Sequence, residues 1–196
     1  MGEKFRPEVY TVGEIRALLK TFSRRYPTGL RNAGMVATGY AGGLRCSEVL
    51  GLRVKDVNLK TGDCFIQNSK GGKARSVVLN ESALAYIERW VKARRKILKE
   101  RGVKSAPLFC TLGGKELQSK YVRAFMTRHG AKAKLTKRCH FHGLRHSFAM
   151  ETVRNQTPLN VVRKALGHSS LAVTTRYLDH INGDDLREAS NAIPEF

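Results

Sequence analysis

The spacing of hydrophobic and polar residues predicts a mostly helical chain. Apolar residues recur every three or four positions along much of the sequence, which is typical of helices that bury one face. We expect helices at about residues 11–22, 30–40, 45–50, 80–101, 119–131, 142–155, 158–166, 171–179 and 184–192. Two of the boundaries carry signals of their own. Thr11 and Glu14 form a capping-box pair, and Asn80 can cap the long helix that follows it.

A β-like pattern separates the early helices from the later ones. Short strands are expected at residues 54–59, 64–67 and 74–79, and the glycine-bearing segment 68–73 between the last two reads as a hairpin turn. This turn carries two lysines, Lys70 and Lys73. The predicted fold class is therefore mainly α with a small three-stranded antiparallel β-sheet near the front of the chain.

Composition adds a strong positive charge to this picture. The 196 residues include 36 Lys and Arg but only 16 Asp and Glu, which gives a net charge of +20. Such an excess favours a polyanionic partner, above all nucleic acid, with a merely soluble basic surface as the alternative. The clusters that we expect to touch DNA phosphates are Lys92, Arg94, Arg95 and Lys96, and Lys132, Lys134, Lys137 and Arg138. Each cluster can equally be a solvated helix face.

Two further features of the sequence indicate the cellular location of the protein. No apolar run approaches the ~18 residues needed to span a bilayer, and the first residues lack the apolar core of a signal peptide. The four cysteines, at positions 46, 64, 110 and 139, include no pair with C-x-x-C spacing. We therefore expect reduced thiols, a cytoplasmic location and no membrane partner.

Several residues have the chemistry needed to act on a phosphodiester. Cleavage of this bond builds negative charge on the non-bridging oxygens, and an arginine fork can bind these oxygens in pairs. Arg45 follows two glycines, where a backbone can approach DNA closely. Arg145 lies in an apolar stretch, where burying a charge is costly unless the charge has a binding partner. His142 lies three residues before Arg145, so both should share one helix face. His146 is better explained as a buttressing or packing residue.

A metal site is the competing interpretation of the same segment. Cys139, His140, His142 and His146 lie within eight residues. However, Cys139 and His140 are adjacent, no second pair follows at zinc-finger spacing, and the motif lacks the glutamate of H-E-x-x-H. We expect neither a metal nor another cofactor, so the nucleophile must be a side chain. Tyr177 is the candidate, singled out by its context rather than by its residue type.

Taken together, these residues resemble a known family. Arg45 in the run Gly-Gly-Leu-Arg-Cys-Ser-Glu, the lysine hairpin, His142-x-x-Arg145, Leu-Gly-His168 and Tyr177 occur in an order and spacing similar to the catalytic domain of tyrosine site-specific recombinases. This is the family of phage integrases and Xer-type enzymes. The resemblance covers about residues 8–190, and the five motifs together are specific although each alone is modest.

The resemblance implies a role for each matching residue. Arg45 and Arg145 would bind the scissile phosphate, His142 would assist acid–base chemistry, and His168 would hydrogen-bond the phosphate. Tyr177 would attack to form a 3′-phosphotyrosyl intermediate, without metal or ATP.

Two supporting positions follow from the same resemblance. Lys70 matches the lysine that protonates the leaving 5′ oxygen, with Lys73 as its close competitor. Glu48 would support Arg45.

The resemblance also sets expectations for domains and assembly. Residues 1–10 would be a lead-in, 11–182 the catalytic domain, and 183–196 a tail helix that docks on a neighbouring protomer or folds back on its own domain. Because only 44 residues precede Arg45, we expect this chain to lack the helical core-binding domain that family members carry before the catalytic domain. We therefore expect a monomer without DNA, weak and poorly specific binding to double-stranded DNA, and a tetramer-like synapse only for a full-length protein.

Two other functions remain open at this stage. A type IB topoisomerase-like enzyme would share the covalent chemistry without strand exchange, although such enzymes usually lack the first histidine of H-x-x-R. A non-catalytic DNA-binding regulator would use residues 157–179 as a helix-turn-helix, with Tyr177 as a packing residue.

Overall fold

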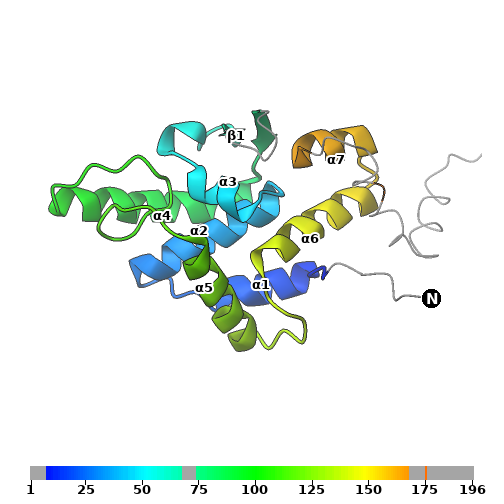
Figure 1. Cartoon of the computed structure of the whole chain (residues 1–196), viewed down its shortest axis with the longest axis horizontal. Helices are drawn as coiled ribbons and strands as arrows, with labels where there is room; N and C mark the ends of the chain where they lie inside the picture. Colours follow the sequence, from blue (N-terminus) through cyan, green and yellow to red (C-terminus); the bar gives the residue numbers. More distant parts are fainter. Residues whose placement is uncertain (1–7, 68–73, 168–174, 176–196) are drawn as a thin grey trace, which may run out of the picture.

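The computed structural model describes residues 8–67, 74–167 and 175, and Figure 1 shows its arrangement. The elements are α1 (Val12–Lys20), α2 (Pro27–Ala41), α3 (Cys46–Gly51), the 3-10 helix η1 (Val54–Asp56), β1 (Asp63–Ile66), β2 (Arg75–Val78), α4 (Glu81–Glu100), α5 (Ser119–Lys132), α6 (Phe141–Arg154) and α7 (Leu159–Leu166). The predicted mainly helical class is confirmed. Apart from Thr175, which is helical, the helices expected at 171–179 and 184–192 lie outside the described residues.

Helix boundaries follow the local capping chemistry. Thr11 Oγ1 accepts the Glu14 amide at 3.1 Å and the Glu14 carboxylate accepts the Thr11 amide at 2.7 Å, so the predicted capping box is confirmed. Asn80 Oδ1 caps α4 by accepting the Ala83 amide at 3.0 Å. These caps fix where α1 and α4 begin.

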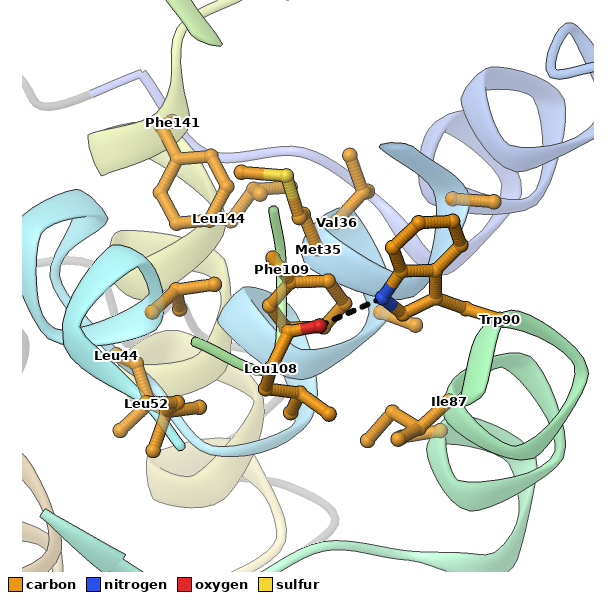
Figure 2. Close-up of a cluster of buried hydrophobic side chains, with 14 of the residues drawn as sticks. Met35, Val36, Leu44, Leu52, Ile87, Trp90, Leu108, Phe109, Phe141 and Leu144 are labelled. Atoms are coloured by element: carbon orange, nitrogen blue, oxygen red, sulfur yellow. Dashed lines mark hydrogen bonds between the residues drawn. The ribbon is translucent and has the colours of Figure 1, made fainter. Parts of the chain in front are cut away.

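Helix α2 is the centre of the fold. It packs against α4 and α6, and Figure 1 shows α2 near the middle, with α4 extending to the left and α6 to the right. Figure 2 shows Met35 and Val36 of α2 among side chains from α4, α6 and the segment that contains Leu108. The Trp90 indole N–H donates to the Leu108 carbonyl at 2.8 Å, so the largest buried side chain has its polar atom satisfied.

The sheet is smaller than predicted. Strands β1 and β2 pair antiparallel, with Asp63 opposite Val78, and the expected strand at residues 54–59 is wrong. Its first residues form η1, because the Asp56 carboxylate accepts the Arg53 amide at 2.8 Å and the Gln67 side chain at 2.7 Å. The short polar side chain of Asp56 thus hydrogen-bonds the backbone in a turn, in competition with the backbone pairing of a β-sheet.

The last residues of the predicted lead-in are packed structure. Tyr10 is 3% exposed and belongs to the main core cluster, and its amide donates to Ser147 Oγ at 2.7 Å. Tyr10, at the end of the predicted lead-in, is therefore part of the packed core. Within the described residues, no helix combines the length and apolarity that crossing a bilayer would require.

Candidate phosphate-binding site

The corner between α2 and α3 presents the first arginine. Gly43 adopts φ +59°, a left-handed conformation that glycine tolerates, and a Cβ there would meet the Phe148 ring at 2.4 Å. Arg45 then forms the N-cap of α3. The Glu48 carboxylate accepts its amide at 2.8 Å and its guanidinium at 3.0 Å, which leaves the Arg45 side chain 22% exposed.

Arg75, which the sequence interpretation missed, forms a second ion pair with Glu48. Arg75 of β2 donates to both Glu48 oxygens, at 2.7 and 2.9 Å, and its Nε donates to the Ala165 carbonyl of α7 at 2.7 Å. Its side chain is 7% exposed and that of Glu48 is 0% exposed. We call Arg45, Glu48 and Arg75 the Glu48 cluster. The signal was present in the strand pattern, because Arg75 lies two positions before buried Val77 and so on the same face of the strand, and a charge that points inward needs a buried partner.

The electrostatics of the Glu48 cluster favour an ionised carboxylate. Burial alone would raise the pKa of Glu48, but the hydrogen bonds and charges of Arg75 and Arg45 outweigh it and lower the pKa. The cluster therefore carries two guanidinium charges against one carboxylate, and a net positive charge remains beside the partly exposed Arg45.

The second predicted arginine, Arg145, lies inside α6. It is 1% exposed, and it donates to the Gly43 carbonyl at 2.8 Å and to the Leu166 carbonyl at 2.6 Å. We call this arrangement the Arg145 site. Gly43 lies two residues before Arg45, so both arginines border the same short turn although they are 100 positions apart in sequence. The structure thus brings together two positive groups that the sequence selected separately.

His142 lies one helical turn before Arg145, on the same helix. His142 is exposed, and its ring contacts the His146 ring edge-on, with 4.4 Å between the ring centroids. The surrounding protein removes part of the ring's hydration, and the charges of Arg145, His140 and Arg45 add to this effect; together they lower the pKa of His142. The ring is therefore mainly neutral at pH 7.

The residues weighed for a metal have other partners. His140 Nδ1 accepts the Gly143 amide at 3.1 Å as the N-cap of α6, and its Nε2 lies 2.8 Å from the Glu8 carboxylate. Cys139 is a buried free thiol whose pKa burial raises to about 11. Over residues 8–67 and 74–167, no three His, Cys, Asp or Glu side chains gather as a metal-ligand group.

Three predicted catalytic residues, Lys70, His168 and Tyr177, and the supporting Lys73 lie outside the described part of the chain. Their flanks are described. Strand β1 ends at Ile66, β2 begins at Arg75, and α7 ends at Leu166, with Gly167 as its C-cap at φ +65°. The roles of these four residues stay predictions.

The basic clusters separate into exposed and buried members. Lys92, Arg95 and Lys96 are exposed on α4, but Arg94 is only 9% exposed and donates to the carbonyls of Ser105 and Pro107, at 2.6 to 3.2 Å. The Arg94 guanidinium therefore anchors a loop, unlike the three exposed members of its cluster.

The second basic cluster is exposed throughout. Lys132, Lys134, Lys137 and Arg138 all lie on the surface. Lys137 also contacts the protein itself, donating to the Val9 carbonyl at 2.8 Å and to the Glu14 carboxylate at 3.1 Å.

Comparison with known proteins gives a consistent picture. The family model described as "Phage integrase family" matches residues 8–182. Tyrosine recombinase XerD of Staphylococcus epidermidis is 33% identical over 187 residues, which are 95% of this chain and 62% of that protein. XerD of Staphylococcus aureus is 33% identical over 190 residues, which are 96% of this chain and 63% of that protein. The chain thus spans less than two thirds of the length of these relatives.

Solved structures agree on the fold. The XerA recombinase superposes with a TM-score of 0.81 at 24% identity, covering 99% of this chain and 68% of that one. The XerH site-specific recombinase, in a post-cleavage complex with a palindromic difH substrate, superposes with a TM-score of 0.76 at 28% identity, covering 95% of this chain and 53% of that one.

Proposed function

The chain belongs to the phage integrase family, and from that premise we propose that it is the catalytic part of a site-specific DNA recombinase. It would cleave and rejoin DNA through a covalent bond between a tyrosine and the DNA. The observation that carries the proposal is the meeting of Arg45 and Arg145 at the turn that follows Gly43. Two guanidiniums at one turn suit the two non-bridging oxygens of a single phosphate.

The reaction we propose conserves the energy of the phosphodiester bond. Tyr177 Oη attacks the scissile phosphorus, the bond to the 5′ oxygen breaks, and a 3′-phosphotyrosyl linkage forms. The departing 5′ oxygen takes a proton from Lys70 or Lys73, and His168 hydrogen-bonds the phosphate. Attack by a 5′ hydroxyl on the same phosphorus reverses these steps, so neither ATP nor a metal is required.

His142 is suited to proton transfer in this scheme. Its lowered pKa keeps the imidazole mainly neutral at pH 7, so the ring can accept a proton when the phenol of Tyr177 is deprotonated. Arg145, one turn further along α6, would hold the phosphate beside it. A neutral base next to a fixed cation is a workable pair for a reaction that develops negative charge.

Double-stranded DNA is the substrate and partner in this proposal. The exposed lysines and arginines of α4 and of residues 132–138 supply positive surface beyond the phosphate-binding site. We propose a monomer without DNA and an oligomeric, tetramer-like complex on DNA for the complete protein. A cytoplasmic location is part of the same proposal.

One assay tests the function. The protein is incubated in EDTA, without nucleotide, with a suicide substrate whose nick lets the 5′ product diffuse away, and protein–DNA adducts are resolved under denaturing conditions. We expect an adduct with the wild type and none with Tyr177→Phe, which keeps the ring and removes only the nucleophilic oxygen. An adduct that survives Tyr177→Phe would contradict the assignment.

The same assay separates the two rival functions. Cleavage and resealing that relax supercoils, without exchange between two DNA molecules, would indicate a topoisomerase-like enzyme. DNA binding without any adduct would indicate a regulator.

A further inference from the structure

Tyr10 is attached to the helix that carries His142 and Arg145. Its hydroxyl donates to the Arg138 carbonyl at 2.8 Å and accepts the His140 amide at 2.9 Å. These contacts span 128 and 130 positions of sequence and fall on the segment that leads directly into α6. Burial raises the pKa of Tyr10, so the hydroxyl stays protonated and keeps both its donor and its acceptor role.

The contact extends along the first turns of α6. A Cβ on Gly143 would lie 2.5 Å from the Tyr10 ring, so the ring lies directly against the helix backbone at this position. The Tyr10 amide donates to Ser147 Oγ at 2.7 Å, and that hydroxyl donates in turn to the Gly143 carbonyl at 2.8 Å. His142 and Arg145 lie between these points of attachment.

Neighbouring residues hold Tyr10 in its place. Glu8 lies 2.8 Å from His140 Nε2, and Lys137 Nζ donates to the Val9 carbonyl at 2.8 Å. Both contacts join the segment 8–10 to the segment that precedes α6. The chain therefore enters the fold by lying against the N-terminal end of the helix that holds the phosphate-binding residues.

We propose that Tyr10 is a positioning residue, which fixes the rotation and the start of α6 and thereby aims His142 and Arg145 at the phosphate. Its consequence for catalysis rests on the proposed function, but its effect on the geometry of α6 does not. The hydroxyl matters because His140 N–H and Arg138 C=O both depend on it, and a loosened first turn would let the His142 ring move. Misplacement of a reacting group by about 1 Å can cost on the order of a hundredfold in rate.

The test compares two tyrosine-to-phenylalanine variants. Tyr10→Phe keeps the ring against Gly143 and removes only the hydroxyl. The matched control is Tyr121→Phe on α5, which also removes a hydroxyl that takes part in several internal hydrogen bonds, with Arg31 and Asn32 of α2. Any general cost of losing such a hydroxyl should appear in both variants, whereas an effect on α6 should appear in one.

Two readouts are measured at a temperature where both variants are fully folded. The first is the NMR titration of the His142 ring in the DNA-free protein, which requires no activity. We expect the His142 chemical shifts and pKa to change in Tyr10→Phe and to match the wild type in Tyr121→Phe. The second is the single-turnover rate of adduct formation at saturating DNA. We expect about a tenfold or larger loss in Tyr10→Phe, with the Kd for DNA within about twofold of the wild type.

The outcomes distinguish this proposal from the function it refers to. An unchanged His142 titration in Tyr10→Phe, or the same change in Tyr121→Phe, overturns the positioning role. A wild type that forms no adduct refutes the proposed function, while the His142 titration still decides whether Tyr10 positions α6. As a second variant, Ser147→Ala removes the acceptor of the Tyr10 amide and should shift the His142 signals in the same direction.

Discussion

The Glu48 cluster and the Arg145 site hold their arginines by different means. In the Glu48 cluster, a fully buried carboxylate lies between two guanidiniums, and Arg45 remains 22% exposed. At the Arg145 site, the guanidinium is 1% exposed and donates to the carbonyls of Gly43 and Leu166. The first region therefore depends on charge pairing, and the second depends on backbone carbonyls that two separate segments place around the guanidinium.

This difference predicts how substitutions in each region affect stability and catalysis. Removing the carboxylate from the Glu48 cluster leaves like charges close together, one of them buried, so the cost should be large and electrostatic. Replacing the fork of Arg145 by another cation keeps the charge but loses the geometry, so the cost should be moderate and should fall more heavily on catalysis.

The largest expected effect comes from Glu48→Ala. Breaking a buried ion pair by removing one partner typically costs about 3–5 kcal/mol, because the remaining charge stays buried without compensation. We expect a loss of this size in the free energy of unfolding, measured by urea denaturation. The control is Glu100→Ala, whose carboxylate is 60% exposed and lies 3.9 Å from Lys96; it should change stability by less than about 0.5 kcal/mol. Equal effects of the two variants would contradict the comparison.

Arg145→Lys should have the next largest effect. A lysine cannot reproduce the two diverging hydrogen bonds to Gly43 and Leu166, so one carbonyl loses its donor at a cost of about 1–3 kcal/mol. Urea denaturation measures this loss, and the adduct assay should show a much larger proportional fall in rate than in DNA affinity. If rate and affinity fell by the same factor, Arg145 would be a general binding residue.

The pH dependence of stability should distinguish the two regions further. The folded-state pKa of Glu48 is lowered from its ordinary value of 4.5, so its stabilising contribution is present above about pH 4.5 and is lost as the pH falls through the folded-state pKa. Glu48→Gln keeps the shape of the side chain and cannot titrate. The difference in unfolding free energy between wild type and Glu48→Gln should therefore shrink on acidification, and a constant difference from pH 7 to pH 3 would contradict this.

The smallest effects on stability should come from the exposed basic residues. Lys96→Ala removes a 79% exposed side chain and should change the unfolding free energy by less than about 0.5 kcal/mol. It should nevertheless weaken DNA binding and lower the salt-dependence slope by about one. Arg94→Ala, two positions earlier and buried, should do the reverse, destabilising the fold with little change in that slope. Fluorescence titrations over a range of salt concentrations measure both slopes.

Local signals explain which parts of the fold were predictable. The Thr11 capping box, the Asn80 cap and the glycines after α2 each act within a few residues, so their helices were placed correctly from sequence. The strand expected at residues 54–59 does not form because the Asp56 carboxylate binds the Arg53 amide, and a strand pattern in the sequence does not reveal that competition. The tertiary role of Tyr10 was invisible because its partners lie about 130 positions away.

The candidate site shows the same division. Arg45, His142 and Arg145 were selected by motif, and the structure places Arg45 and Arg145 at one turn. Arg75 was missed because its purpose depends on Glu48 and Ala165, which only the fold brings to it. The burial of Arg94 was not predicted, because a charged residue within a basic run gives no sign, in sequence, that loop carbonyls bind it.

The most direct test of the central claim, that Arg45 and Arg145 neutralise the charge of one scissile phosphate, replaces that phosphate. A methylphosphonate at the scissile position removes the negative charge and keeps the phosphorus centre. Adduct formation by Arg45→Ala and Arg145→Ala is measured on the phosphodiester and on the methylphosphonate, with the wild type as reference and at a temperature where each variant is folded. We expect both variants to be severely impaired on the phosphodiester and substantially restored on the neutral substrate. Equal impairment on the two substrates would contradict the claim.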